Sequence, residues 1–393
     1  MGLTPAEGRI LTTHVGVLEI PIEVESALAQ HATPPVLKEA VAAVVQRQVE
    51  TGLDIVNDGE FGKSFWTLYA ADRMDGVEWR DETDIALLRG RDYAAFPDFY
   101  GWAIQTPGVL VWNQPPVTAT KPVCVGPLSY RPDAIQRDIA NLKSALEHVD
   151  VTDAFLPTVA PASIEAHFGN EHYGSQDELL YALADALHDE YRAIVEAGFQ
   201  LQVDDAWIPL LWSLNSQIEP QEYRRIVATR IDALNHALAG LPPERVRYHV
   251  CWGSWHGPHA HDVPLVDIVD LILRVNAGTY LLEAANPRHE HEVRVWETTK
   301  LPEGKKLAPG VVAHSTNVIE HPELVAERIV RYAERVGADN VIASTDCGMG
   351  LRIHPELAWA KLAALVEGAR LASDRLYGRG AGGDPSPIAA GAK

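Results

Sequence analysis

Short apolar runs rich in β-branched residues alternate along this chain with longer stretches of helical period. The run at 10–16, ILTTHVG, is followed by a stretch over 34–52 that begins with proline, has apolar residues at helical spacing and ends at glycine. The same alternation predicts eight more strands, at 54–60, 121–127, 154–161, 200–205, 246–252, 279–285, 310–315 and 340–348. Further helices are predicted over 133–148, 177–198, 220–240, 264–276, 322–337 and 355–373.

Repeated strand–helix units with nearly continuous apolar strands indicate a parallel sheet that is covered by helices. Seven or more such units favour a closed (β/α)8 TIM barrel, here a single catalytic domain over 1–375. A barrel takes eight strands, so we expect the ninth candidate, the proline-broken 154–161, to be an excursion. The segment 61–120 is too long for an ordinary loop and predicts an insertion after the second strand, over one barrel mouth. The Gly/Pro/Ala-rich segment 376–393 is expected to be a disordered tail.

Composition narrows the range of partners. The 393 residues contain 33 lysines and arginines against 54 acidic residues, a formal charge of −21, which argues against nucleic acid and anionic membranes as partners. No run of about 18 apolar residues predicts a membrane span, and the first residues lack the apolar core of a signal peptide. Three cysteines form no disulfide framework, so we expect a cytoplasmic protein. Composition leaves open whether the chain forms an oligomer.

Polar and nucleophilic side chains cluster where the predicted strands end. In a TIM barrel the catalytic residues gather at the carboxyl ends of the strands. Those ends carry acids, histidines and cysteines, namely His14, Asp58, Glu60, Asp204, Asp205, His249, Cys251, Glu283, His314, Asp346 and Cys347. This pattern predicts one site at one mouth of the barrel.

His249 and Cys251 lie two residues apart, which places both side chains on the same face of a strand. Imidazole and thiolate are ligands that suit zinc, and Glu283 and Cys347 would complete a tetrahedral set from later strands. A single buried cysteine is more often a small hydrophobic residue, which is the interpretation we prefer for Cys124. Spacing alone leaves both interpretations of the His249 and Cys251 pair open.

The order His-x-Cys, then Glu, then Cys within DCG resembles the C-terminal catalytic barrel of the cobalamin-independent methionine synthase family. The resemblance covers most of the chain and includes DGE at 58–60, GP at 126–127 and QVDD at 202–205. It implies a TIM barrel that activates a small thiol on zinc for attack on an alkyl donor. By the same resemblance, Zn²⁺ is held by His249, Cys251, Glu283 and Cys347.

The length of the chain leaves room for one barrel, so it resembles the single-barrel members, which include archaeal-type methionine synthases and epoxyalkane:coenzyme M transferases. Val17 stands where methionine synthases have a serine that helps to hold the homocysteine carboxylate, whereas Glu60 matches the glutamate that binds the amino group. We therefore expect a zinc-dependent thiol alkyltransferase whose partners are a small thiol and a small-molecule alkyl donor. The donor is either a methyl donor or an epoxide.

Other side chains are expected to surround this centre. Trp66, Trp207, Trp252 and Trp255 follow predicted strand ends and are interpreted as the walls of a substrate chamber, although a single tryptophan more often fills a core. Arg352 and Arg288 are candidates for binding a carboxylate, sulfonate or phosphate. His14, Glu60, Asp204 and Asp205 are candidates for substrate binding. The candidates for proton transfer are His14, Asp205, His314 and Asp346.

Two histidine-rich segments, 256–262 and 286–292, are a second candidate for metal binding, and the alternatives are a hydrated loop network or a set of proton donors. Two alternative functions also stay open. A zinc-dependent C–S lyase or dealkylase would run the chemistry in reverse and release a thiol. A metal-free decarboxylase of the same barrel superfamily would rely on arginines and an aspartate instead.

Overall fold

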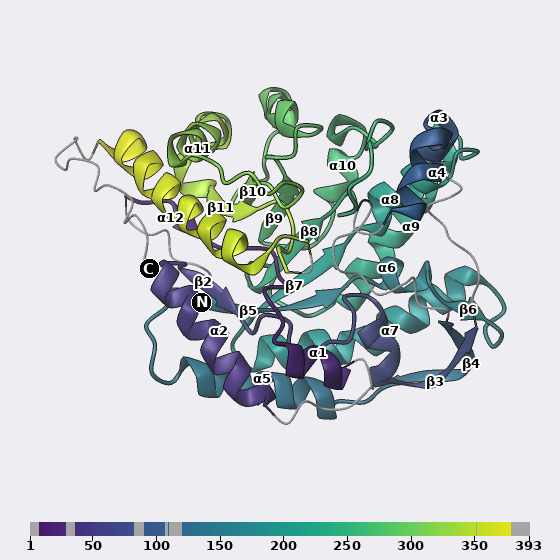
Figure 1. The fold of residues 1–393 in the computed structure, drawn as a ribbon. Coiled ribbons are helices and arrows are strands. Elements are labelled where there is room, and N and C mark those ends of the chain that lie inside the picture. Colours follow the sequence, from purple (N-terminus) through teal and green to yellow (C-terminus); the bar gives the residue numbers. More distant parts are fainter. Residues whose placement is uncertain are drawn as a thin grey trace.

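The computed structural model describes residues 8–28, 36–81, 90–106, 109, 120–350 and 352–378. Eight parallel strands form one sheet in the order β1–β11–β10–β9–β8–β7–β5–β2 (Figure 1). Their bounds are Leu11–Thr12 (β1), Ile55–Asn57 (β2), Asp153–Val159 (β5), Gln200–Asp205 (β7), Val246–Val250 (β8), Thr279–Glu283 (β9), Lys306–Val312 (β10) and Ile342–Thr345 (β11).

The two edge strands of this order meet and nearly close the sheet. The backbone N–H of Asp54 donates to the carbonyl oxygen of Thr12 at 3.2 Å, and Thr13 Oγ1 donates to the carbonyl oxygen of Ile55 at 3.2 Å. The arrangement is a nearly closed, eight-stranded parallel barrel with helices outside it, which confirms the predicted (β/α)8 fold.

Helices connect the strands and cover the outside of the barrel. Their bounds are Ile22–Leu28 (α1), Leu37–Thr51 (α2), Asp133–Leu146 (α5), Pro161–Glu165 (α6), Gln176–Glu196 (α7), Trp207–Leu214 (α8), Pro220–Ala237 (α9), Val269–Ile272 (α10), Pro322–Val336 (α11) and Pro355–Tyr377 (α12). The helix predicted over 264–276 is broken into a short 3-10 turn, Leu265–Asp267, and α10. Of the predicted tail, 379–393 lies outside the described residues. No helix in the described ranges is both long and apolar enough to cross a membrane.

The strand outside the barrel is not the one that the sequence predicted. The run at 154–161 forms β5, a barrel strand between β2 and β7, whereas 121–127 lies in β4 (Thr120–Tyr130). Strand β4 pairs with β3 (Met74–Asp81) and β6 (Gly169–Asn170) in a separate three-stranded sheet beside the barrel. The prediction that 154–161 is an excursion is therefore wrong.

Pro157 is tolerated inside β5 because of where its backbone points. Strand β2 pairs only with Asp153–Phe155, so no strand lies beside Pro157 on that side. Its carbonyl oxygen accepts a hydrogen bond from Lys63 Nζ instead. The N–H and C=O of one strand residue point to the same side, so the missing N–H of proline interrupts no bond to a neighbouring strand.

The insertion after β2 runs past its predicted end, since β4 pairs with β3 within it. Its other elements are the 3-10 helix η1 (Leu68–Arg73), α3 (Arg91–Ala95) and α4 (Pro97–Gln105). Helix α3 contacts the loops that follow β7 and β8. Asp92 accepts hydrogen bonds from the backbone N–H groups of Ala260 and His261. The described part of α3 thus lies at the mouth where the strands end.

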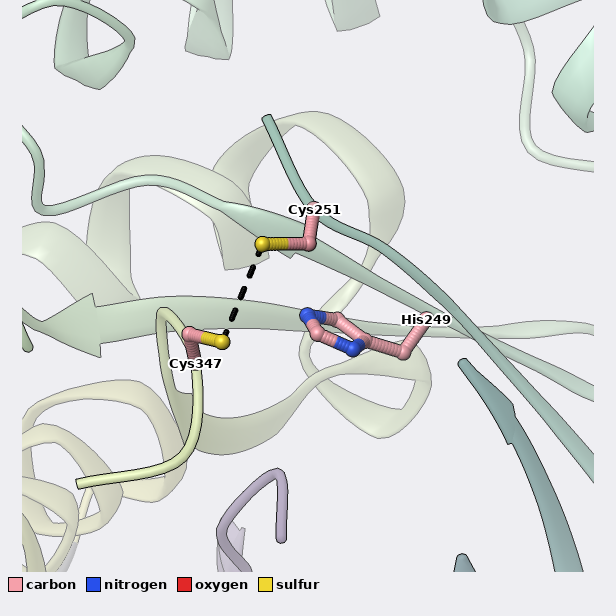
Figure 2. Close-up of side chains that lie close together, drawn as sticks. All are labelled: His249, Cys251 and Cys347. Atoms are coloured by element: carbon pink, nitrogen blue, oxygen red, sulfur yellow. Dashed lines mark hydrogen bonds between the residues drawn. The ribbon is translucent and has the colours of Figure 1, made fainter. Parts of the chain in front are cut away.

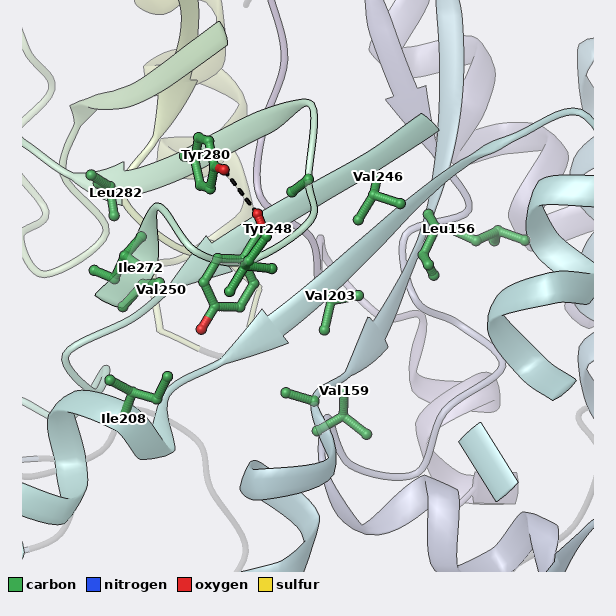
Figure 3. Packing of buried hydrophobic residues seen from close by; sticks show 14 of the residues in the cluster. Leu156, Val159, Val203, Ile208, Val246, Tyr248, Val250, Ile272, Tyr280 and Leu282 are labelled. Carbon is green, nitrogen blue, oxygen red and sulfur yellow. Dashed lines mark hydrogen bonds between the residues drawn. The ribbon is translucent and has the colours of Figure 1, made fainter. Parts of the chain in front are cut away.

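The core has two layers because successive side chains along each barrel strand point alternately outside and inside the barrel. Val203, Tyr248 and Tyr280, from three neighbouring strands, are buried on the outer face with Ile208 and Ile272 (Figure 3). A second cluster fills the barrel interior and consists of Leu11, Val15, Ile55, Phe155, Leu281, Ala308 and Ile342. Both faces of these strands are apolar, which explains their nearly continuous apolar sequence.

A buried ion-pair network ties the insertion to the barrel helices. Arg73, at the end of η1, donates to Asp138 of α5 at 2.5 Å and to Glu190 of α7 at 3.1 Å, and all three side chains are buried. Removing one partner of a buried ion pair leaves uncompensated charge, which typically costs about 3–5 kcal/mol.

We predict that Arg73→Met lowers the free energy of unfolding by about 3–5 kcal/mol, because two buried carboxylates lose their cation. Arg131→Met is the matched control, since the ion pair of Arg131 with Asp75 is about half exposed, at 49% and 59%. An exposed pair contributes about 0–1 kcal/mol. Urea denaturation measures both variants, and equal losses would contradict the structural role of Arg73.

Candidate functional site

Two thiols and one imidazole come together at the carboxyl ends of β8 and β11 (Figure 2). One ligand atom from each of His249, Cys251 and Cys347 lies within 4.8 Å of the others. His249 and Cys251 point inward from β8 and its end, because residues two apart share a face of the strand. Asp204 accepts a hydrogen bond from His249 Nδ1 at 2.9 Å, which fixes the orientation of the ring.

The separation of the two sulfurs fits a shared tetrahedral metal. Two thiolates at the usual Zn–S distance of about 2.3 Å and a tetrahedral angle lie about 3.8 Å apart. The Sγ atoms of Cys251 and Cys347 are 3.7 Å apart, well beyond the roughly 2.05 Å of a disulfide. Two sulfurs and an imidazole form a donor set that suits zinc.

The shared hydrogen bond shifts the pKa values of the two cysteines in opposite directions. The hydrogen bond from Cys251 lowers the pKa of Cys347 to about 5, with smaller help from Arg352 and His249. The same hydrogen bond, together with burial, raises the pKa of Cys251. Ser254 Oγ also donates to the Cys347 sulfur at 3.0 Å, and the Gly253 N–H donates to the Cys251 sulfur at 3.3 Å. The two sulfurs therefore share one proton through their hydrogen bond, which favours a thiolate within the pair.

Glu283, the fourth predicted ligand, belongs to a neighbouring group with His314 and Asp346, all three buried. Its Oε1 accepts the Trp252 N–H at 2.9 Å, and its Oε2 accepts from Asn286 Nδ2 at 3.2 Å. Asp346 Oδ2 and His314 Nδ1 are buried without a hydrogen-bond partner among the described residues. The predicted ligand set thus divides into three side chains in one group and Glu283 beside them.

A cavity of about 230 Å³ opens onto the two sulfurs. Most of its wall is apolar, with Val15, Val17, Phe65 and Leu210 among the lining residues. The candidate residues that line it are Glu60, Trp66, Asp204, Asp205, His249, Cys251, Trp255, Cys347 and Arg352. The structure therefore gathers side chains from across the chain around one thiol centre.

Besides Glu283, His314 and Asp346, three further candidates lie away from this cavity. His14 is buried against Gln48, with its Nε2 2.8 Å from Gln48 Oε1, and burial lowers its pKa to about 4. Trp252 donates its indole N–H to the Val263 carbonyl at 2.8 Å, and Trp207 packs against the ring of His167. None of the three lines the described cavity wall. For Trp252 the strand alternation gives the reason, since the inward face already carries His249 and Cys251.

The cavity acids already have partners within the protein. Asp205 accepts from Ser163 and the Trp207 N–H on one oxygen and from Tyr248 on the other. Asp204 is bonded to His249 and Gln202. Both oxygens of Asp205 are thus bonded within the protein, whereas the bonds of Asp204 fall on its Oδ1 and orient the His249 ring.

Glu60 pairs with Lys63, a cavity residue that the sequence did not single out, at 3.2 Å. The backbone of Glu60 has φ +63°, an unfavourable conformation for a residue other than glycine, which typically occurs where a functional side chain must be aimed. Lys63 follows Glu60 by three residues, and this spacing was the one sequence feature that could have indicated the ion pair.

The two histidine-rich segments share a buried ionic network beside the site. Asp262 Oδ2 accepts from His259 Nδ1 at 2.9 Å and from His289 Nε2 at 3.1 Å. His289 Nδ1 donates to Glu292 at 2.8 Å. Burial opposes the charge on His289, but the bonds to Asp262 and Glu292 prevail and raise its pKa to about 10. The network fixes the loops after β8 and β9 against each other.

A barrel that collects two thiols and an imidazole beside a cavity at its carboxyl mouth defines the class of this protein, that of TIM barrels with a thiol-containing site. The chain belongs to the cobalamin-independent synthase family, because the model of that family's catalytic domain matches residues 161–371. This confirms the resemblance seen in the sequence.

Known proteins that are similar to this chain in sequence or structure include methionine synthases. The methionine synthases of Saccharolobus solfataricus and Thermococcus kodakarensis are each 25% identical to it over 347 residues. These alignments cover 87% and 88% of this chain and 86% and 85% of the two relatives. A B12-independent methionine synthase from Shewanella sp. W3-18-1 superposes with a TM-score of 0.72 at 20% identity, covering 94% of this chain and 99% of that one. The structural likeness shows a shared fold.

We predict that His289→Gln destabilises the protein in a pH-dependent way. The pKa of His289 rises from 6.5 to about 10 on folding, so its charge stabilises the fold fully below pH 6.5 and loses that effect as pH rises through 10. The difference in unfolding free energy from the unchanged protein should therefore be largest near pH 6 and shrink toward pH 10. Urea denaturation across this range measures it, with exposed His291→Gln as control. A difference that grows with pH would contradict the assignment.

Proposed function

We propose that this protein is a zinc-dependent alkyltransferase that moves a methyl or other small alkyl group onto the sulfur of a small thiol. The observation that carries the proposal is the group of His249, Cys251 and Cys347 facing the cavity, with a sulfur–sulfur distance that suits a tetrahedral metal. Membership of the cobalamin-independent synthase family and the archaeal methionine synthase relatives support thiol methylation.

His249, Cys251 and Cys347 would hold the zinc ion, with Glu283 next to them as the candidate for a fourth ligand. Bound zinc lowers the pKa of a thiol ligand and so provides a thiolate near neutral pH, where a free thiol is mostly protonated. The apolar wall around this centre limits competing hydration of the sulfur. Asp204, which holds the His249 ring, keeps the imidazole aimed at the two sulfurs.

Arg352 is placed to bind the tail of the thiol substrate. It lines the cavity with the sulfurs, and its Nε donates to the Ser254 carbonyl at 3.0 Å. That bond leaves both terminal amino groups of the guanidinium for a ligand, and no carboxylate of the described residues forms an ion pair with it. A guanidinium binds carboxylate and sulfonate groups through two parallel hydrogen bonds.

In this proposal His314 is the candidate for stabilising the leaving atom through a hydrogen bond. Its Nδ1 has no hydrogen-bond partner in the described structure, whereas His14 and Asp205 are engaged with protein groups. Burial lowers the pKa of His314 well below its usual value, so the ring is neutral and its N–H can donate a hydrogen bond to the leaving atom. Asp346 lies beside it.

We predict that the cobalt-substituted protein binds small thiols and that the sulfur-to-metal absorption bands then shift. Homocysteine, 2-mercaptoethanesulfonate and glutathione form the panel. Cys251→Ala and Cys347→Ala should each abolish the shift, because each removes a metal ligand. Cys124→Ala is the matched control and should keep it, since Cys124 is buried in β4, away from the cavity. Absence of a shift with every thiol would contradict the proposed function.

The role of Arg352 is tested with two thiols that share the same two-carbon chain, anionic 2-mercaptoethanesulfonate and neutral 2-mercaptoethanol. Arg352→Gln should weaken binding of the anionic thiol about tenfold or more, as expected for a lost charged hydrogen bond, and change binding of the neutral thiol little. Titration of the same absorption bands gives both dissociation constants. Equal losses for the two thiols would contradict a role in anion binding.

A further inference from the structure

A second cavity, of about 520 Å³, lies beside the cavity that opens onto the sulfurs. It is formed by the loops after β8, β9 and β10, and shares Gly253 and Trp255 with the first cavity. The thiol-binding centre just proposed does not account for it. Its size is sufficient for a small organic substrate.

The side chains that line this second cavity differ from the acidic composition of the protein, with Arg288 as their cation. Its described wall contains His256, His259, Arg288 and His314 and no carboxylate, in a chain with 54 acidic residues. His259 is paired with Asp262, and Arg288 donates to the Ala260 carbonyl at 2.7 Å. Asn286, the remaining strongly polar side chain of the wall, is bonded to Glu283 behind it. An anion is therefore the ligand that this wall favours.

Nitrogen atoms in the wall lack partners. His256 Nε2 and His314 Nδ1 are buried and have no hydrogen-bond partner within the described ranges. The His314 side chain is 1% exposed, so solvent scarcely reaches it. Buried polar atoms without partners are costly and uncommon in folded proteins, and a ligand with oxygen acceptors would satisfy their N–H groups.

Trp255 separates the two cavities. A Cβ atom on Gly253 would lie 2.1 Å from its ring, and one on Gly257 would lie 2.0 Å from it, so both glycines allow the indole to pack closely. His259 stacks on the ring, with the centroids 4.4 Å apart. The N–H of Gly253 bonds the Cys251 sulfur, so the boundary between the cavities adjoins the thiol centre.

We propose that the second cavity binds the alkyl donor, and that this donor carries an oxyanion group held by Arg288 and His256. The inference rests on the proposed alkyl transfer. The carbon to be transferred then lies at the Trp255 boundary, facing the substrate sulfur. In the transfer the thiolate sulfur forms a bond to that carbon, the bond from the carbon to the leaving atom breaks, and the leaving atom departs with the electron pair and is protonated by solvent water.

Two alkylating reagents that differ in charge test this arrangement. Metal-free protein is treated with iodoacetate or with neutral iodoacetamide, and mass spectrometry gives the rates at Cys251 and Cys347. Each rate is divided by that of free 2-mercaptoethanol with the same reagent. In both reactions sulfur displaces iodide, so the ratio of the two normalised rates reports how strongly the protein attracts an anionic electrophile. Neither zinc nor a thiol substrate is needed, so failure of the proposed function leaves this ratio measurable.

The unchanged protein should prefer iodoacetate after normalisation, and Arg288→Gln should lower that preference at least about threefold, because a cation raises the local concentration of anions. Arg294→Gln, an exposed arginine outside the cavity wall, is the matched control and should leave the ratio unchanged. Equal ratios in the two variants would overturn the proposal.

A second measurement needs no variant. Sulfate, compared with chloride at equal ionic strength, should slow iodoacetate more than iodoacetamide, because it competes for the same groups. Equal slowing of both reagents in the unchanged protein would likewise overturn the proposal, whatever the stability of the variants.

Discussion

The alternation of side chains along one barrel strand is the constraint on which both the core and the site depend. Tyr248 and Val250 of β8 are buried in the core outside the barrel, while His249 and Cys251 point to its interior and mouth. Because the sheet is parallel and nearly closed, the end of β11 brings Cys347 to the same mouth. A shift of one residue in β8 would exchange the two faces, bury His249 and Cys251 among helices and expose the core residues to the cavity. The ligands are thus held in place by the packing of their neighbours.

Charge is distributed unevenly around this mouth. The acids of the first cavity are bonded to Lys63, Gln202, Ser163 and Tyr248, which keeps them from competing for a cation. The second cavity is lined by histidines and an arginine, and Asp262 and Glu292 fix the loops behind it. In a protein of net charge −21, such a local region can attract an anion that the remaining surface repels. The two cavities therefore favour different ligands on either side of Trp255.

Sequence patterns predicted the barrel and most helices because apolar periodicity reflects burial directly. They failed where three-dimensional pairing decided the outcome. Pro157 predicted a break in the strand, yet its backbone polar groups point past the end of β2 and no ladder bond is lost. The apolar run in β4 has no such break, but it pairs with β3 outside the barrel. The spacing of His249 and Cys251 anticipated their common face. It did not reveal that Glu283 is bonded to Trp252 and Asn286, nor that Lys63 enters the cavity, since both depend on loop geometry.

The central claim is that His249, Cys251 and Cys347 form a zinc centre that accepts a substrate sulfur. X-ray absorption at the zinc edge tests it most directly, on protein purified without added metal and measured before and after addition of thiol. The account predicts zinc bound by two sulfurs at about 2.3 Å and by nitrogen or oxygen ligands, with a third sulfur once thiol is added. Less than about 0.3 zinc per chain, or a ligand shell without sulfur that thiol leaves unchanged, would contradict it.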